Sequence, residues 1–322
     1  MGQRVLVTGG AGFIGSHLVD SLLADQYEVL NIDNFDPFYD RSVKERNIKR
    51  SLVHPHYTFK EYSILDRAGI NQLCEEWQPD LIVHLAAKAG VRPSVESPQT
   101  YFDTNVTGTV NIMDAAVTQS VKKVILASSS SVYGLNQTTP FAETDPILDP
   151  ASPYGASKIA GEAIGRSYSH CYSLPVTALR FFTVYGPRQR PDLAIHKFAR
   201  KIVKGESIPV FGDGTTSRDY TFIDDIVAGI RGAMEREQTG YDVFNLGNDQ
   251  PVSLRQLIEE LEEALGKKAK IDWLPPQIGD VPHTWANIEK AKQIGYCPKT
   301  DFKQGIHRFV EWLHGSKYEI TT

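Results

Sequence analysis

The chain opens on a short apolar strand that runs directly into a glycine-rich turn. Residues 4–8 read RVLVT, and the following GGAGFIG places glycines at 9, 12 and 15, before apolar residues recur at helical spacing in 17–25. A strand, a tight glycine turn and a helix start together let a pyrophosphate approach the backbone and the positive end of the helix. This opening therefore predicts a dinucleotide site. The alternative is a turn with a purely structural role.

The next apolar segment ends on an acidic residue. Asp33 closes the strand-like EVLNID, 18 residues after Gly15. A carboxylate at this point accepts hydrogen bonds from an adenosine ribose and repels a 2′-phosphate. The position therefore favours NAD over NADP, and the alternative is an aspartate that only stabilises a turn.

The first half of the chain alternates strand-like and helix-like segments. Helical spacing is clear in HLVDSLLAD and GTVNIMDAAVTQ. Such alternation predicts an α/β fold with a doubly wound parallel sheet covered on both faces. Five further strands are expected in EVLNID, TFKEY, DLIVHLAA, KVILASS and PVTALRFF.

The pattern changes after Gly186. Prolines and the turn GDGTT break the chain into short pieces, and amphipathic helices are expected over 252–265 and 302–314. We predict a first domain over 1–185 and a smaller α/β domain over 186–322, with part of 218–248 returning to the first sheet.

Composition excludes several classes of protein. A net charge of −5 argues against a nucleic-acid binder. No apolar run approaches the about 18 residues that a membrane span needs, so no membrane partner is expected. Cys74, Cys171 and Cys297 are odd in number and widely spaced, which favours reduced thiols in a cytoplasmic protein. His54 and His56 have no companion ligands nearby, so no metal site is predicted.

A tyrosine and a lysine stand four residues apart in SPYGASK. Of the 14 tyrosines, only Tyr154 has a lysine, Lys158, four positions on. Ser152 and Pro153 are typical of a helix start, so both side chains would share one helical face. A nearby ammonium favours the phenolate, whose ordinary pKa near ~10 makes it a poor base at neutral pH. The pair predicts proton transfer coupled to hydride transfer, and the alternative is a chance pair on a solvated surface.

These motifs resemble, in order, those of the nucleotide-sugar epimerase branch of the extended short-chain dehydrogenases/reductases. The matching segments are TGGAGFIGSHL, HLAA, SSVYG, YGASK, RFFTVYGP, SRDYTFIDDI and GDVP. The resemblance spans nearly the whole chain. It implies a Rossmann domain of about seven strands, a C-terminal nucleotide-sugar domain and tightly held NAD. It also implies a homodimer paired through helices near 100–118 and 153–170.

The resemblance assigns catalysis to Tyr154, Lys158 and Ser129, whose hydroxyl would bridge the sugar 4-hydroxyl and the phenol. Asn105 would order the lysine, and Phe181 would pack on the nicotinamide. The cofactor contacts it implies are Gly9, Gly12, Phe13, Ile14, Gly15, Asp33, Asn34, Ser63, Ile64, Leu85, Ala86, Ala87, Lys88, Asn105, Ser128, Tyr154, Lys158 and Phe181.

The serine run before VYG separates the reactions within this branch. Sugar dehydratases carry acidic residues there, whereas this chain has serines at 129–131, which supports epimerisation. Further segments resemble the subfamily that acts on UDP-glucuronate and forms UDP-galacturonate, and Arg190 would hold the sugar carboxylate. The substrate contacts implied are Lys88, Arg92, Ser129, Ser130, Ser131, Thr183, Arg190, Arg218 and Asp280.

Two alternatives stay open at this point. One is a 4-epimerase of a neutral or N-acetylated UDP-hexose. The other is a catalytically idle NAD-binding regulatory protein on the same scaffold, although such proteins usually lose the tyrosine or the lysine, and both are present here.

Overall fold

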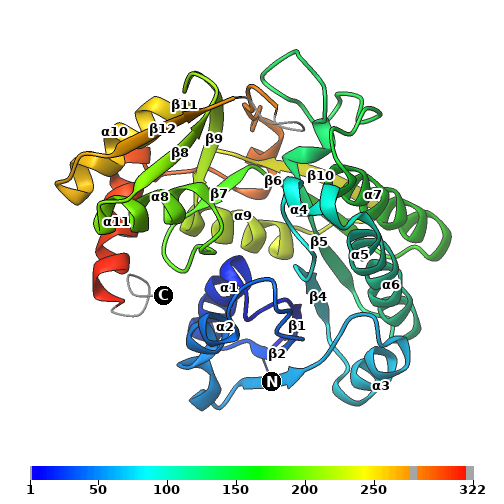
Figure 1. The fold of residues 1–322 in the computed structure, drawn as a ribbon. Coiled ribbons are helices and arrows are strands. Elements are labelled where there is room, and N and C mark those ends of the chain that lie inside the picture. Colours follow the sequence, from blue (N-terminus) through cyan, green and yellow to red (C-terminus); the bar gives the residue numbers. More distant parts are fainter. Residues whose placement is uncertain (1, 276–280, 317–322) are drawn as a thin grey trace.

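The first half of the chain forms most of a seven-stranded parallel sheet (Figure 1). The computed structural model describes residues 2–275 and 281–316. The strand order is β10-β6-β5-β4-β1-β2-β3, so the order reverses between β1 and β4. Ligands bind beside the carboxyl ends of strands at such a reversal. The strands are β1 (Arg4–Thr8), β2 (Glu28–Asp33), β3 (Tyr57–Glu61), β4 (Leu81–His84), β5 (Lys123–Ser129), β6 (Val176–Phe181) and β10 (Tyr241–Leu246).

Helices cover both faces of this sheet, which confirms the predicted α/β class. Within β1, Val5 and Val7 pack in the core beneath α1, whereas Leu6 belongs to the core on the α6 side. Both sides of the strand are therefore apolar, as parallel sheets require. One face carries α1 (Phe13–Ala24) and α9 (Ile223–Glu235), and the other carries α3 (Arg67–Trp77), α6 (Gly108–Thr118) and α7 (Pro153–Tyr172).

Short helices shape the edge where the strands end. α2 (Arg41–Ile48) lies in the polar insertion after β2, followed by a 3₁₀ turn at Ser51–Val53. α4 (Val91–Glu96) and α5 (Pro98–Phe102) follow β4 and lead through one π turn at Asp103–Thr107 into α6. A 3₁₀ turn at Ser130–Tyr133 follows β5.

The second half forms a smaller layer over this edge (Figure 1). Its strands form a three-stranded sheet, β11-β9-β7, and a two-stranded sheet, β12-β8. The predicted domain boundary at residue 186 stays a prediction. From beyond it, β10 pairs with β6 in the first sheet, and α9 packs against α1 on one face of that sheet. The elements are β7 (Thr183–Tyr185), α8 (Ala194–Lys204), β8 (Ser207–Phe211), β9 (Ser217–Phe222), β11 (Pro251–Ser253), α10 (Leu254–Leu265), β12 (Lys270–Leu274), a 3₁₀ turn (Lys290–Ile294) and α11 (Phe302–Gly315).

Across residues 2–275 and 281–316, no helix combines the length and the apolar character that a bilayer crossing requires.

Candidate active site

The glycine turn leaves no room for side chains between β1 and α1. Gly9 has φ +73°, and a Cβ there would lie 2.8 Å from the Ala86 nitrogen. A Cβ on Gly15 would clash with the carbonyl of Gly9. Gly12 caps α1 without a side chain, so the first amide groups of the helix lie open to the cavity described below. The cradle fits a dinucleotide pyrophosphate.

Asp33 is buried at the end of β2, and a second charged group accompanies it. Its Oδ2 accepts the Ala11 amide at 3.3 Å, and its Oδ1 accepts the Phe35 amide at 2.9 Å. The Lys44 ammonium, reaching back from α2, lies 3.1 Å from Oδ1 and is also buried. Sequence reasoning missed Lys44. Its charge offsets that of Asp33, so the carboxylate alone does not set the charge at this end of the cavity.

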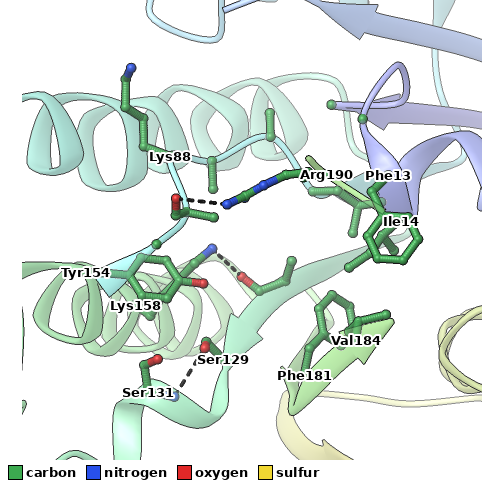
Figure 2. A pocket seen from close by; sticks show the side chains of 18 of the residues that line it. Phe13, Ile14, Lys88, Ser129, Ser131, Tyr154, Lys158, Phe181, Val184 and Arg190 are labelled. Atoms are coloured by element: carbon green, nitrogen blue, oxygen red, sulfur yellow. Dashed lines mark hydrogen bonds between the residues drawn. The ribbon is translucent and has the colours of Figure 1, made fainter. Parts of the chain in front are cut away.

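Helix α7 presents Tyr154 and Lys158 to the end of β5 (Figure 2). Ser152 caps the helix by accepting the Gly155 amide at 3.1 Å, and Pro153 occupies the first turn. Lys158 Nζ donates to the Ala127 carbonyl at 2.9 Å and lies 6.0 Å from the centre of the Tyr154 ring. The predicted pair therefore lies on one face, inside the protein and beside the sheet.

Burial controls the ionisation of both groups. It raises the pKa of Tyr154, while a hydrogen bond with Ser129 and the charge of Arg190 lower it. Tyr154 lines the cavity and is half-buried. Burial also lowers the pKa of Lys158 to about 8, against the charge of Glu162. The sequence argument gave the ammonium the main role and missed both desolvation and Arg190.

Arg190 reaches into the site from the segment after β7 (Figure 2). Its Nε and Nη2 donate to the two oxygens of Asp192 at 3.0 and 2.7 Å, and Nη2 also donates to the Ala89 carbonyl at 3.4 Å. The guanidinium carbon lies 5.2 Å from the centre of the Phe38 ring. The described residues offer its Nη1 no hydrogen-bond partner, so this edge is left for a ligand.

A cavity of about 510 Å³ joins these groups at the carboxyl edge of the sheet. The volume is within the range of small-molecule sites, which runs from about 300 to about 1,000 Å³. Most predicted site residues line it, namely Gly9, Gly12, Phe13, Ile14, Gly15, Asp33, Asn34, Ser63, Ile64, Leu85, Ala86, Ala87, Lys88, Ser128, Ser129, Ser130, Ser131, Tyr154, Lys158, Phe181, Thr183, Arg190 and Arg218.

The other predicted contacts are not all in the cavity wall: Asn105 and Arg92 do not line it, and Lys88 lines it with its ammonium turned aside. The Lys88 ammonium pairs with Asp36 at 3.0 Å and points away from Tyr154 (Figure 2). Asn105 lies beneath the wall, where its carboxamide binds the Lys88 backbone and the Ser157 hydroxyl. Arg92 lies 4.9 Å from the centre of the Phe211 ring. Asp280 falls outside the described residues.

The insertion after β2 supplies wall residues that sequence reasoning missed. Phe38, Tyr39 and Lys44 line the cavity, as does Tyr101, whose ring meets Tyr154 edge-on at 6.2 Å. From the second half, Thr284 also contributes. The wall is thus assembled from segments far apart in sequence.

Comparison with known proteins agrees with this geometry. The profile of the family described as GDP-mannose 4,6 dehydratase matches residues 6–309. The chain belongs to this family of extended short-chain dehydrogenases/reductases. One relative, UDP-glucuronate 4-epimerase 2 of Arabidopsis thaliana, is 43% identical over 332 residues, covering 98% of this chain and 76% of its own.

Solved structures of the family share the whole fold. A UDP-glucuronic acid 4-epimerase from Bacillus cereus, in complex with UDP-glucuronic acid and NAD, superposes with a TM-score of 0.92 at 34% identity, covering 97% of this chain and 99% of its own. A UDP-glucose 4-epimerase from Thermotoga maritima, with UDP-glucose, gives 0.90 at 34% identity, covering 98% and 99%. The fold is therefore common to epimerases of acidic and neutral sugars.

Proposed function

We propose that this chain is an NAD-dependent 4-epimerase that interconverts UDP-glucuronate and UDP-galacturonate. The observation that carries the proposal is that Tyr154, Lys158 and Arg190 face one cavity together with the glycine turn. The relatives named as UDP-glucuronate 4-epimerases support the substrate.

The glycine turn and Asp33 are suited to hold NAD. The cradle at Gly9, Gly12 and Gly15 would take the pyrophosphate, and Asp33 with Lys44 would take the adenosine ribose. When bound, oxidised NAD would supply a hydride acceptor for carbon 4 of the sugar and a positive ring charge. The remaining chemistry belongs to the protein.

Tyr154 handles the proton. As a phenolate it accepts the proton of the sugar 4-hydroxyl when hydride leaves carbon 4, and it gives the proton back when hydride returns. The Ser129 hydroxyl, which hydrogen-bonds with the phenol, would relay or orient this proton. The charge of Arg190 lowers the pKa of the phenol, and we assign the same role to the Lys158 ammonium, which lies 6.0 Å from the ring centre.

Arg190 is placed to protect the sugar carboxylate. Oxidation at carbon 4 turns a uronate into a β-keto acid, which loses carbon dioxide when its carboxylate bond aligns with the ketone. Donors from Arg190 and Thr183 on the cavity wall would hold the carboxylate out of that alignment. We assign Ser130 and Ser131 to the sugar end, and Arg218 and Asp280 to the nucleotide end. The substrate contacts implied for Lys88 and Arg92 stay predictions, because the Lys88 ammonium pairs with Asp36.

A neutral UDP-hexose is the second candidate substrate, because the Thermotoga maritima enzyme matches as well as the Bacillus cereus enzyme in identity. Incubation with UDP-glucuronate or UDP-glucose, without added cofactor, followed by proton NMR of the sugar, decides between them. UDP-galacturonate as the product supports the proposal, and conversion of UDP-glucose alone refutes it. The Tyr154→Phe variant serves as the inactive control.

We further propose a cytoplasmic homodimer paired through α6 and α7. These helices pack against each other, and Tyr172 at the end of α7 and Phe102 at the end of α5, which also packs on α7, are exposed. Three free cysteines fit a reducing compartment. Light scattering of the purified protein tests the dimer, and a monomer at micromolar concentration would refute it.

A further inference from the structure

Helix α7 carries a third ionisable residue on the face that holds Tyr154 and Lys158. Glu162 lies one turn beyond Lys158 and is 4% exposed. Its Oε1 accepts the Ser128 hydroxyl at 2.5 Å and Arg180 Nε at 2.9 Å, and its Oε2 accepts Arg180 Nη2 at 2.8 Å. Every bond of this carboxylate is therefore made inside the protein, with no direct access to a ligand.

The end of β5 meets this helix face residue by residue. The Ala127 carbonyl accepts the Lys158 ammonium, the Ser128 hydroxyl donates to Glu162, and Ser129 interacts with Tyr154. Three consecutive strand residues thus contact three successive turns of α7. The Ser128–Glu162 bond joins two buried residues, and its strand residue stands between those that contact Lys158 and Tyr154.

The far side of Glu162 is closed by a buried network. Arg180 Nη1 donates to the Tyr133 hydroxyl at 3.0 Å, which donates to Asn245 on β10 at 2.6 Å. The guanidinium carbon also lies 4.9 Å from the centre of the Tyr133 ring. A buried ion pair is weak evidence for a stabilising role, because desolvation opposes the attraction. Because the Glu162–Arg180 ion pair lies behind Tyr154 and Lys158, we expect it to have a functional role.

Building on the proposed function, we propose that Glu162 is a positioning residue for the reaction, which holds Lys158 in its protonated form against the Ala127 carbonyl and beside Tyr154.

The charges around Lys158 support this role. From α7 it faces Tyr154 and Glu162, and from β4 it faces His84, which is neutral because burial lowers its pKa to about 3. From β6, Arg180 adds a positive charge on the far side of Glu162. Burial lowers the pKa of Lys158 to about 8, and the charge of Glu162 is what opposes this. Without it, Lys158 would lose its proton closer to neutral pH.

The test is the pH dependence of kcat in Glu162→Gln, which keeps the shape of the side chain and removes its charge. We expect the alkaline limb to move down by about one pH unit, with KM little changed. At pH values above the shifted limb kcat should fall about tenfold. A uniform loss at every pH, with the limb unmoved, would show a merely structural role and overturn the proposal.

Asp242→Asn is the matched control. Asp242 lies on β10 and pairs with Arg236 and Lys290, each at 2.7 Å, so its loss also strips ion pairs from the sheet. We expect a lower melting temperature and an unmoved alkaline limb. A similar shift of the alkaline limb in Asp242→Asn would mean that the shift in Glu162→Gln comes from lower stability and not from the lost charge of Glu162.

A double variant removes the complication of an unpaired Arg180. In Glu162→Gln with Arg180→Met, no buried guanidinium is left without its carboxylate, so folding is easier to retain. The shifted limb should persist. Recovery of the wild-type profile would mean that Glu162 serves only to pair Arg180.

NMR of the labelled lysine side chains, with the Lys158 signal assigned by its loss in Lys158→Met, measures the same effect without turnover. We expect Lys158 to lose its proton at lower pH in Glu162→Gln, and an unchanged titration would contradict the role of Glu162. This readout needs no substrate, so it separates failure of this inference from failure of the proposed substrate.

Discussion

Replacement of Arg190 by methionine tests whether the cavity is built for an acidic sugar. Methionine keeps much of the apolar contact with Phe38 and removes the guanidinium. Loss of the guanidinium removes a partner of the UDP-glucuronate carboxylate. The sugar of UDP-glucose carries no charge, so it loses no such partner. The difference between the two sugars therefore isolates the carboxylate interaction.

The magnitude follows from the bonds that Arg190 already makes. Nε and Nη2 are bound to Asp192, so the Nη1 edge remains for the substrate. The side chain is 16% exposed, so solvent screens the contact only in part. A hydrogen bond to a charged group contributes about 1.5–3 kcal/mol. With about 1.4 kcal/mol for each factor of ten, the affinity for UDP-glucuronate should fall about 10- to 150-fold.

Calorimetric titration in a Tyr154→Phe background measures both sugars without turnover. Arg188→Met is the matched control, because Arg188 stands two residues away and pairs with Asp20 on α1 at 2.7 Å. We expect the affinity for UDP-glucose to change less than about threefold in either variant, because a substitution that removes no specific interaction usually changes the free energy by about 0.5 kcal/mol or less. An equal loss for both sugars would refute carboxylate recognition by Arg190. In the active background, Arg190→Met should also release more decarboxylated product.

Four further predictions concern the cofactor and the proton. Tyr154→Phe should abolish turnover while bound NAD, measured after denaturation, stays at the wild-type level; loss of NAD as well would point to a structural role. Gly15→Ala should purify with little NAD because its Cβ clashes with the Gly9 carbonyl, whereas Gly315→Ala, at the end of α11 in open space, should retain it. Wild-type kcat should decline as pH rises through about 8, because the ammonium of Lys158 is present below its pKa and lost above it; a rate still rising at pH 10 would contradict this. Lys44→Met should lower NAD retention, and unchanged retention would show that Asp33 suffices.

Local chemistry predicted the parts of the site that a short segment determines. Ser152 and Pro153 start α7 as their residue types indicate, and the four-residue spacing placed Tyr154 and Lys158 on one face. The glycine turn likewise follows from sterics within one βα unit. These features need no knowledge of distant segments.

Contacts between distant segments escaped sequence reasoning. Lys44 meets Asp33 because α2 folds back over the end of β2, and no spacing rule in the polar insertion indicates this. Lys88 pairs with Asp36 across 52 positions, which turns its ammonium away from the sugar end. In each case tertiary packing chose one partner among many.

Burial explains why the site needs so many compensating charges. An enclosed cavity keeps water away from a reactive keto sugar, but the same enclosure raises the pKa of Tyr154 and lowers that of Lys158, which weakens both catalytic groups. Ser129 and Arg190 act on the phenol, and Glu162 acts on the ammonium. If this reasoning holds, Arg190→Met should raise the pH at which the Tyr154 phenolate forms, and Glu162→Gln should lower the pH at which Lys158 loses its proton, because the two charges act on different members of one buried pair. A shift of both groups in either variant would contradict this division of roles.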